Sequence, residues 1–183
     1  MKIACLLIEN LPVQAEIQRN PQIAERPIIL SVSAGSYRTV FDASPSLSGV
    51  FPDMPLGKAL SYSRNVISLQ ADPFHYQEIF RCVLSSLERY GVDFEIEKLG
   101  QVYVRLDNAA AIYGDEIGLA DEILKAVPSH LNPKIGVATG KFPAELAAIM
   151  SKAGSITWVP DDLQDFLYPI PIDFLACKWE IKS

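Results

Sequence analysis

The sequence predicts a mixed α/β or α+β protein in which helices cover a β-sheet. Short apolar runs of strand length alternate along the chain with amphipathic stretches of helical spacing. Two strand-like runs, at residues 94–99 and 102–106, are separated only by Gly100 and Gln101, as in a hairpin. A chain of 183 residues, 49% of them hydrophobic, is long enough to bury a core of that kind.

Four strands and three helices are predicted in the first half of the chain. The unbroken apolar run at 3–8 is typical of a strand that is buried on both faces. Pro12 suits the first turn of the helix that follows, and the small residues at 33–36 favour a turn between two strands. The predicted strands are 3–8, 27–32, 37–41 and 66–69, and the predicted helices are 12–19, 54–60 and 73–90.

The helix at 73–90 is the clearest one, because its apolar residues recur at helical spacing and Gly91 follows as a stop. Residues 166–175 resemble a crossing between domains, so we expect the chain to be a piece of a longer protein. After the hairpin, the predicted elements are a helix at 112–126, a strand at 134–138, a helix at 142–152, a strand at 156–159 and a helical turn from 161.

Charge and composition disfavour several classes of function. The net charge of −6 has the wrong sign for a protein that grips nucleic acid alone through phosphate contacts. Cys5, Cys82 and Cys177 lack ligand spacing, and His75 and His130 are isolated, so we expect neither a zinc site nor a hydrolase triad. The apolar start is too short for a signal peptide or a membrane span, which favours a cytoplasmic protein without a membrane partner.

Five segments carry motifs that occur in one order. They are Ile8-Glu9-Asn10 with Arg19-Asn20-Pro21, Arg26-Pro27-Ile28-Ile29, Gly49-Val50 with Met54-Pro55-Leu56, Glu95–Val104, and Gly136–Phe142 followed by Ala144, Ala147 and Lys152. In this order and spacing they resemble the palm and fingers of the Y-family translesion DNA polymerases, the DinB/UmuC group. The resemblance runs from about residue 1 to residue 175.

The resemblance implies an α+β fold with a ferredoxin-like polymerase palm. That palm would have a mixed β-sheet with helices on one face, and a small fingers insertion would accompany it. The implied division assigns residues 1–10 and 64–168 to the palm, 11–63 to the fingers-like insertion, and 169–183 to the start of a truncated thumb.

The positions that the resemblance assigns to metal binding lack carboxylates in this chain. The family's first metal-binding Asp falls on Leu7, and its Asp-Glu pair falls on Gly100 and Gln101. Phosphoryl transfer of this kind needs clustered carboxylates to hold two divalent ions. Glu9, on the same strand face as Leu7, and Glu97, just before the turn, are weak candidate ligands, and for Glu9 a solvated strand end is the simpler interpretation.

The nucleotide-contacting positions differ as well. The bulky residue that excludes ribonucleotides falls on Pro12, and the two residues that contact the triphosphate fall on Ala43 and Ser46. Lys141 and Lys152 remain as nucleotide-binding remnants, of which Lys152 would point at phosphate. For Lys141 solvent exposure is the plainer interpretation, and for Lys152 a favourable place at a helix end.

These departures predict a non-catalytic homologue that needs no cofactor or metal, similar to the ImuB-type proteins of bacterial SOS mutagenesis cassettes. The resemblance implies an adaptor in translesion synthesis after DNA damage. In the full-length protein its partners would be an error-prone polymerase, a RecA-like accessory protein, the sliding clamp and DNA. By itself, this chain is expected to bind DNA weakly or not at all.

Two alternatives stay open from the sequence. The first is an active, magnesium-dependent DNA-directed nucleotidyltransferase whose carboxylates have moved to Glu9, Glu95 or Glu97. The second is an unrelated α/β binding or metabolic protein. A hairpin at 97–104 packed beside the strand at 3–8 is the structural feature that the polymerase interpretation requires.

Overall fold

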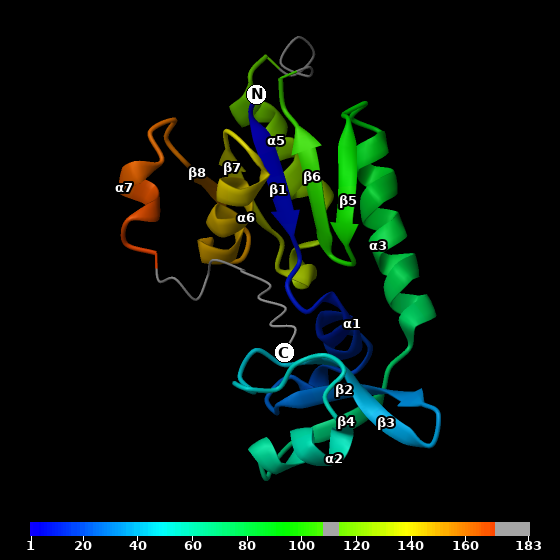
Figure 1. Ribbon diagram of the computed structural model, residues 1–183. Helices are drawn as coiled ribbons and strands as arrows, with labels where there is room; N and C mark the ends of the chain where they lie inside the picture. Colours follow the sequence, from blue (N-terminus) through cyan, green and yellow to red (C-terminus); the bar gives the residue numbers. More distant parts are fainter. Residues whose placement is uncertain (108–113, 171–183) are drawn as a thin grey trace.

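The computed structural model describes residues 1–107 and 114–170, which form two β-sheets joined by a common core (Figure 1). The five-stranded sheet has the order β5-β6-β1-β7-β8 and contains β1 (Ile3–Leu7), β5 (Phe94–Lys98), β6 (Gln101–Arg105), β7 (Lys134–Ala138) and β8 (Ile156–Trp158). The three-stranded sheet has the order β3-β2-β4 and contains β2 (Ile28–Ala34), β3 (Tyr37–Ala43) and β4 (Ile67–Gln70).

The helices lie between and around these strands. They are α1 (Leu11–Arg19), α2 (Leu56–Ala59), α3 (Pro73–Glu88), α5 (Glu116–Ala126), α6 (Lys141–Met150) and α7 (Gln164–Leu167), with 3-10 turns at Pro21–Ile23, Leu60–Tyr62 and Ser129–Leu131. The α+β fold and the order of elements are therefore confirmed. In the described part of the chain, no helix is both long enough and apolar enough to cross a membrane.

Strand β1 is the centre of the large sheet, because it pairs with β6 on one side and β7 on the other, antiparallel to both. Its last residue, Leu7, lies opposite Gln101 on β6 and Lys134 on β7. The predicted hairpin is confirmed, since β5 pairs with β6 and β6 lies beside β1. Directly opposite residues in antiparallel strands share a face of the sheet, so Leu7 and Gln101 point the same way.

Helices cover both faces of this sheet, so the prediction that they lie on one face is wrong. Leu6 and Val104 belong to the core on the side of α3 and α5. Helix α6 lies over β1, β7 and β8 on the opposite side, where alanines of the helix pack against Cys5 and Leu7. The close approach is possible because Gly136 has no side chain: a Cβ there would lie 2.1 Å from Ala144 O.

The small sheet sits at the end of the large one, next to α1 (Figure 1). Strand β4 pairs in parallel with β2, with Ile67 opposite Ile28. The predicted palm range of 64–168 includes β4, whose hydrogen bonds run instead to β2 of the small sheet. Residues 171–183, most of the predicted truncated thumb, and 112–113 of the predicted helix lie outside the described residues.

One buried tyrosine connects the helices that hold the two sheets together. Tyr76 of α3 is fully buried, and its hydroxyl donates to Glu16 Oε1 of α1 at 2.7 Å. The same hydroxyl oxygen accepts from the backbone N–H of Asp72 at 3.0 Å. Burial raises the pKa of the Tyr76 phenol, so it remains a donor, and α1 keeps a fixed position against α3.

The contact at Gly136 yields a stability prediction. Gly136→Ala should lower the free energy of unfolding by at least about 2 kcal/mol, because the methyl group meets backbone atoms of α6 that have no room to retreat. Urea denaturation followed by circular dichroism measures the change.

Gly57→Ala is the matched control, since a Cβ at Gly57 meets nothing within 4 Å. We expect it to be neutral or stabilising by about 0.5 kcal/mol. Equal effects of the two substitutions would contradict the packing of α6 on β7.

Candidate functional site

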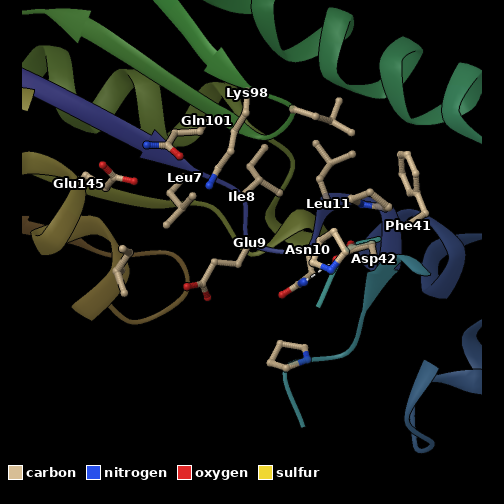
Figure 2. Close-up of a pocket in the computed structure, with 15 residues that line it drawn as sticks. Leu7, Ile8, Glu9, Asn10, Leu11, Phe41, Asp42, Lys98, Gln101 and Glu145 are labelled. Atoms are coloured by element: carbon tan, nitrogen blue, oxygen red, sulfur yellow. Dashed lines mark hydrogen bonds between the residues drawn. The ribbon is translucent and has the colours of Figure 1, made fainter. Parts of the chain in front are cut away.

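A cavity of about 540 Å³ lies where the end of β1 meets the β5–β6 turn, helix α6 and the small sheet (Figure 2). Most of its wall is apolar, and a few charged or amide side chains are placed around it. The lining residues are Leu7, Ile8, Glu9, Asn10, Leu11, Pro12, Phe41, Asp42, Pro45, Pro52, Lys98, Leu99, Gln101, Glu145 and Ile149. This size is within the usual range of ligand pockets.

This one cavity is lined by three positions at which the chain departs from the family's residues: Leu7, Gln101 and Pro12. Leu7 is only 6% exposed and packs under α6. The structure thus brings together residues that are nearly a hundred positions apart in the sequence, through the pairing of β1 with β6. The apolar side chain of Leu7 and the amide of Gln101 form the floor of the cavity, and neither can neutralise the charge of a divalent ion.

Gly100 lies directly behind this floor and is held by the backbone. Its carbonyl accepts a hydrogen bond from the N–H of Ile8 at 2.7 Å. Its φ of +84° is in the left-handed region, and a Cβ would lie 2.6 Å from Ile8 O. The position is therefore closed to a carboxylate by the backbone of the turn as well as by the identity of the residue.

Gln101 begins a buried polar chain that crosses from β6 to α6. Its Nε2 donates to Tyr103 Oη at 3.0 Å, and the Tyr103 hydroxyl donates to Glu145 Oε2 at 3.0 Å. Gln101 Nε2 also lies 3.8 Å from Cys5 Sγ. Among the described residues, Gln101 Oε1 has no hydrogen-bond partner although it is buried.

The same buried environment shifts the pKa values of a thiol and a phenol next to Gln101. Burial, and then the charge of Glu145, raises the pKa of the Cys5 thiol to about 12. Burial likewise raises the pKa of the Tyr103 phenol. Both groups are therefore neutral at physiological pH, and the chain from Gln101 to Glu145 keeps its donors in place.

The candidate carboxylates do not converge. Glu9 lines the cavity but forms a salt bridge with Lys134 at 2.7 Å, and Glu95 pairs with Lys141 at 2.6 Å. Glu97 is exposed on β5 and does not line the cavity. Within residues 1–107 and 114–170, no group of three or more His, Cys, Asp and Glu side chains could hold a metal ion. A two-metal centre does not fit this donor set.

The two lysine remnants lie away from the cavity wall. Lys141 is held by Glu95, and its Nζ is 5.0 Å from the centroid of the Tyr103 ring. Lys152 is exposed beyond the end of α6, and Ser46 is exposed in the loop after β3. Ala43 contributes its carbonyl, which accepts from Asn10 Nδ2 at 2.9 Å.

Sequence reasoning missed the contact that closes the cavity toward the small sheet. Asn10 Nδ2 donates to Asp42 Oδ1 at 2.7 Å. Burial raises the pKa of the Asp42 carboxyl, while hydrogen bonds from Asn10 and from the backbone of Ala43 and Val13 act against this rise. An Asn just before a helix is normally an N-cap signal, but here Asn10 makes no side-chain cap and instead joins α1 to β3.

Tyr103 and Glu145 were also missed as members of this site. A signal existed for each: Tyr103 is two residues from Gln101 and therefore on the same face of β6. Glu145 is a charged residue among the alanines of α6 that pack on that face.

A five-stranded sheet with this cleft at its end and a separate three-stranded sheet across the cleft defines a polymerase-type palm with fingers. The model of the impB/mucB/samB family matches residues 7–149, and the chain belongs to this family. The predicted Y-family palm and fingers region is thereby confirmed.

Three relatives illustrate the similarity. DNA polymerase IV of Metallosphaera sedula is 24% identical over 169 residues, which cover 87% of this chain and 48% of that protein. The crystal structure of DinB from Sulfolobus solfataricus gives a TM-score of 0.81 at 23% identity, over 95% of this chain and 53% of that one. A Y-family DNA polymerase chimera gives a TM-score of 0.79 at 23% identity, with the same coverage. The chain thus spans about half the length of the relatives it matches.

The geometry of the turn yields a prediction at Gly100. Gly100→Asp should lower the free energy of unfolding by about 3 kcal/mol or more, because it adds left-handed strain, a steric contact with Ile8 O and a buried charge. Gly91→Asp is the control, since Gly91 has a φ of +62° but open space around its Cβ position. We expect it to cost about 1 kcal/mol. Similar losses for both would show that the turn at Gly100 is not closed.

The raised pKa of Cys5 yields a second prediction. At pH 8 iodoacetamide should alkylate the exposed Cys82 at least about ten times faster than the buried Cys5, because the thiolate is the reactive form. Mass spectrometry of peptides measures the two sites separately, and both should react after unfolding in urea. Equal rates in the folded protein would contradict the buried network around Gln101.

Proposed function

We propose that this chain is part of a non-catalytic family member that acts as an adaptor in translesion synthesis after DNA damage. One observation carries the proposal: Leu7 and Gln101 face one another on β1 and β6 at the floor of the cleft, and the backbone at Gly100 is closed to a side chain. The three positions that would supply metal-binding carboxylates are thus apolar, amide or without a side chain. Catalysis by two divalent ions has no ligands at these positions.

The charges around the cleft support the same proposal. A nucleoside triphosphate is bound through cations, either metal ions or free lysines and arginines. Here Lys134 and Lys141 are each held by a carboxylate, Glu9 and Glu95 respectively. The cavity wall carries more acidic than basic side chains: Glu9, Asp42 and Glu145 against Lys98. An anionic nucleotide would meet net repulsion in this cleft.

The loss of carboxylates is also reasonable on physical grounds. Two or three carboxylates in a buried cleft without metal repel one another and carry a desolvation cost. Leucine at position 7 instead joins the apolar contact under α6, and Gln101 provides a neutral donor to Tyr103. In this proposal the chain keeps the polymerase fold, and it acts through surfaces that bind partner proteins.

An adaptor works through partners. For the full-length cytoplasmic protein we propose an error-prone polymerase, a RecA-like accessory protein, the sliding clamp and DNA as those partners, in the manner of the ImuB-type proteins. With a net charge of −6, this chain would contribute little to DNA affinity by itself.

The competing function is an active nucleotidyltransferase with relocated carboxylates. Of its candidate ligands, only Glu9 lines the cavity, and Lys134 already neutralises it. Glu95 and Glu97 lie on β5 outside the cavity wall.

Primer extension by the full-length protein separates the two functions. We expect no product above background with Mg²⁺ or Mn²⁺, because the cleft lacks clustered carboxylates, while DNA polymerase IV of Metallosphaera sedula serves as the positive control. Calorimetry should likewise show no Mg²⁺-dependent binding of a deoxynucleoside triphosphate. Extension that disappears in Glu9→Gln would establish the relocated site and overturn the proposal.

A further inference from the structure

One basic side chain enters the cleft directly. Lys98, at the end of β5, lies opposite Gln101 in the hairpin and lines the cavity, and Figure 2 shows its side chain among those around it. For the part of the chain that the structure describes, no hydrogen bond or salt bridge holds the Lys98 ammonium. Lys134, at the cavity end of β7, and Lys141, at the opposite end of the sheet, each have a glutamate partner. Lys98 therefore brings to the cleft a positive charge that no described carboxylate contacts as an ion pair.

The floor of the cleft offers an acceptor without a donor. Gln101 is 0% exposed, its Oε1 has no partner among the described residues, and it lines the same cavity as Lys98. Its amide nitrogen is already committed to Tyr103, which fixes the direction of the oxygen. A buried carbonyl oxygen of this kind costs free energy unless a donor or a cation faces it.

Glu145 completes the arrangement from the side of α6. It lines the cavity and accepts from the Tyr103 hydroxyl through one carboxylate oxygen. The charges of Glu145 and Lys98 act in opposite directions on the pKa of the Cys5 thiol, since the first raises it and the second lowers it. Both charges are therefore close enough to act on the same group, the buried Cys5 thiol.

We propose that Lys98 is an internal counter-ion that occupies this cleft in the place of a divalent cation, opposite the oxygens of Gln101 and Glu145. This inference rests on the proposed non-catalytic function and supplies a means by which the cleft would exclude a metal ion. Carbonyl and carboxylate oxygens are the ligands that Mg²⁺ and Mn²⁺ prefer, and Mg²⁺ binds with as few as one or two carboxylates when it keeps its waters. The tethered ammonium places a positive charge on the cavity wall and would repel such an ion.

The proposal predicts that removal of one charge creates a weak divalent-cation site. Titration of the protein with Mn²⁺, with free Mn²⁺ followed by electron paramagnetic resonance, should show an affinity at least about tenfold higher for Lys98→Met than for the unsubstituted protein. Lys98→Ser should give the same gain, and Lys98→Arg, which keeps the charge, should give none. The double substitution Lys98→Met with Glu145→Gln should lose the gain.

Lys141→Met is the matched control, because Lys141 lies on the same side of the sheet but is paired with Glu95 outside the cavity wall. Thermal unfolding verifies that each variant is folded. The inference is overturned if Lys98→Met and Lys98→Ser gain no more Mn²⁺ affinity than Lys141→Met does. It is also overturned if the unsubstituted protein already binds Mn²⁺ and the substitution Glu145→Gln abolishes that binding.

These outcomes are separable from failure of the proposed function. Primer extension by the unsubstituted protein would overturn the non-catalytic function whatever Lys98 does. Absence of extension together with no gain of Mn²⁺ binding in Lys98→Met would overturn only the role of Lys98.

Discussion

The pairing of β1 with both β6 and β7 is the constraint on which the rest of the molecule depends. Because β1 is hydrogen-bonded along both edges, its side chains have only two directions: toward the core of α3 and α5, or toward α6. Leu7 takes the second direction and so reaches both the alanines of α6 and the floor of the cavity. A substitution at Leu7 therefore changes packing and the cleft together. The same strand register places the polar chain from Gln101 to Glu145.

Much of the fold could be predicted from sequence because its signals are local. The unbroken apolar run of β1, the amphipathic period of α3 and the turn at Gly100 each depend on neighbouring residues only. The layer arrangement was predicted less well. The position of α6 depends on the match between Gly136 and the helix backbone across from it, which no periodicity of one segment reveals.

The candidate site shows the same division. The positions of Leu7 and Gln101 follow from motif order and strand pairing. The salt bridge of Glu9 with Lys134, in contrast, joins the turn after β1 to strand β7, which is far away in sequence. Asn10 has the sequence context of a helix cap but uses its side chain to hold Asp42 of the small sheet. Where a side chain has more than one possible partner, the partner that it binds depends on which one lies near it in the folded chain. The sequence alone does not contain these distances.

The left-handed turn at Gly100 has an evolutionary consequence. Leu7 and Gln101 could in principle be exchanged for acidic residues by replacements that leave the backbone where it is, but Gly100 lies against Ile8 O in a conformation that suits glycine alone. A lineage that has adopted this turn must first rebuild its main chain before an acidic residue there can be tolerated. Intermediates along that path would be less stable than the present chain, because the strain at position 100 comes before the backbone has changed. The turn therefore makes an acidic residue harder to introduce at position 100 than at positions 7 and 101.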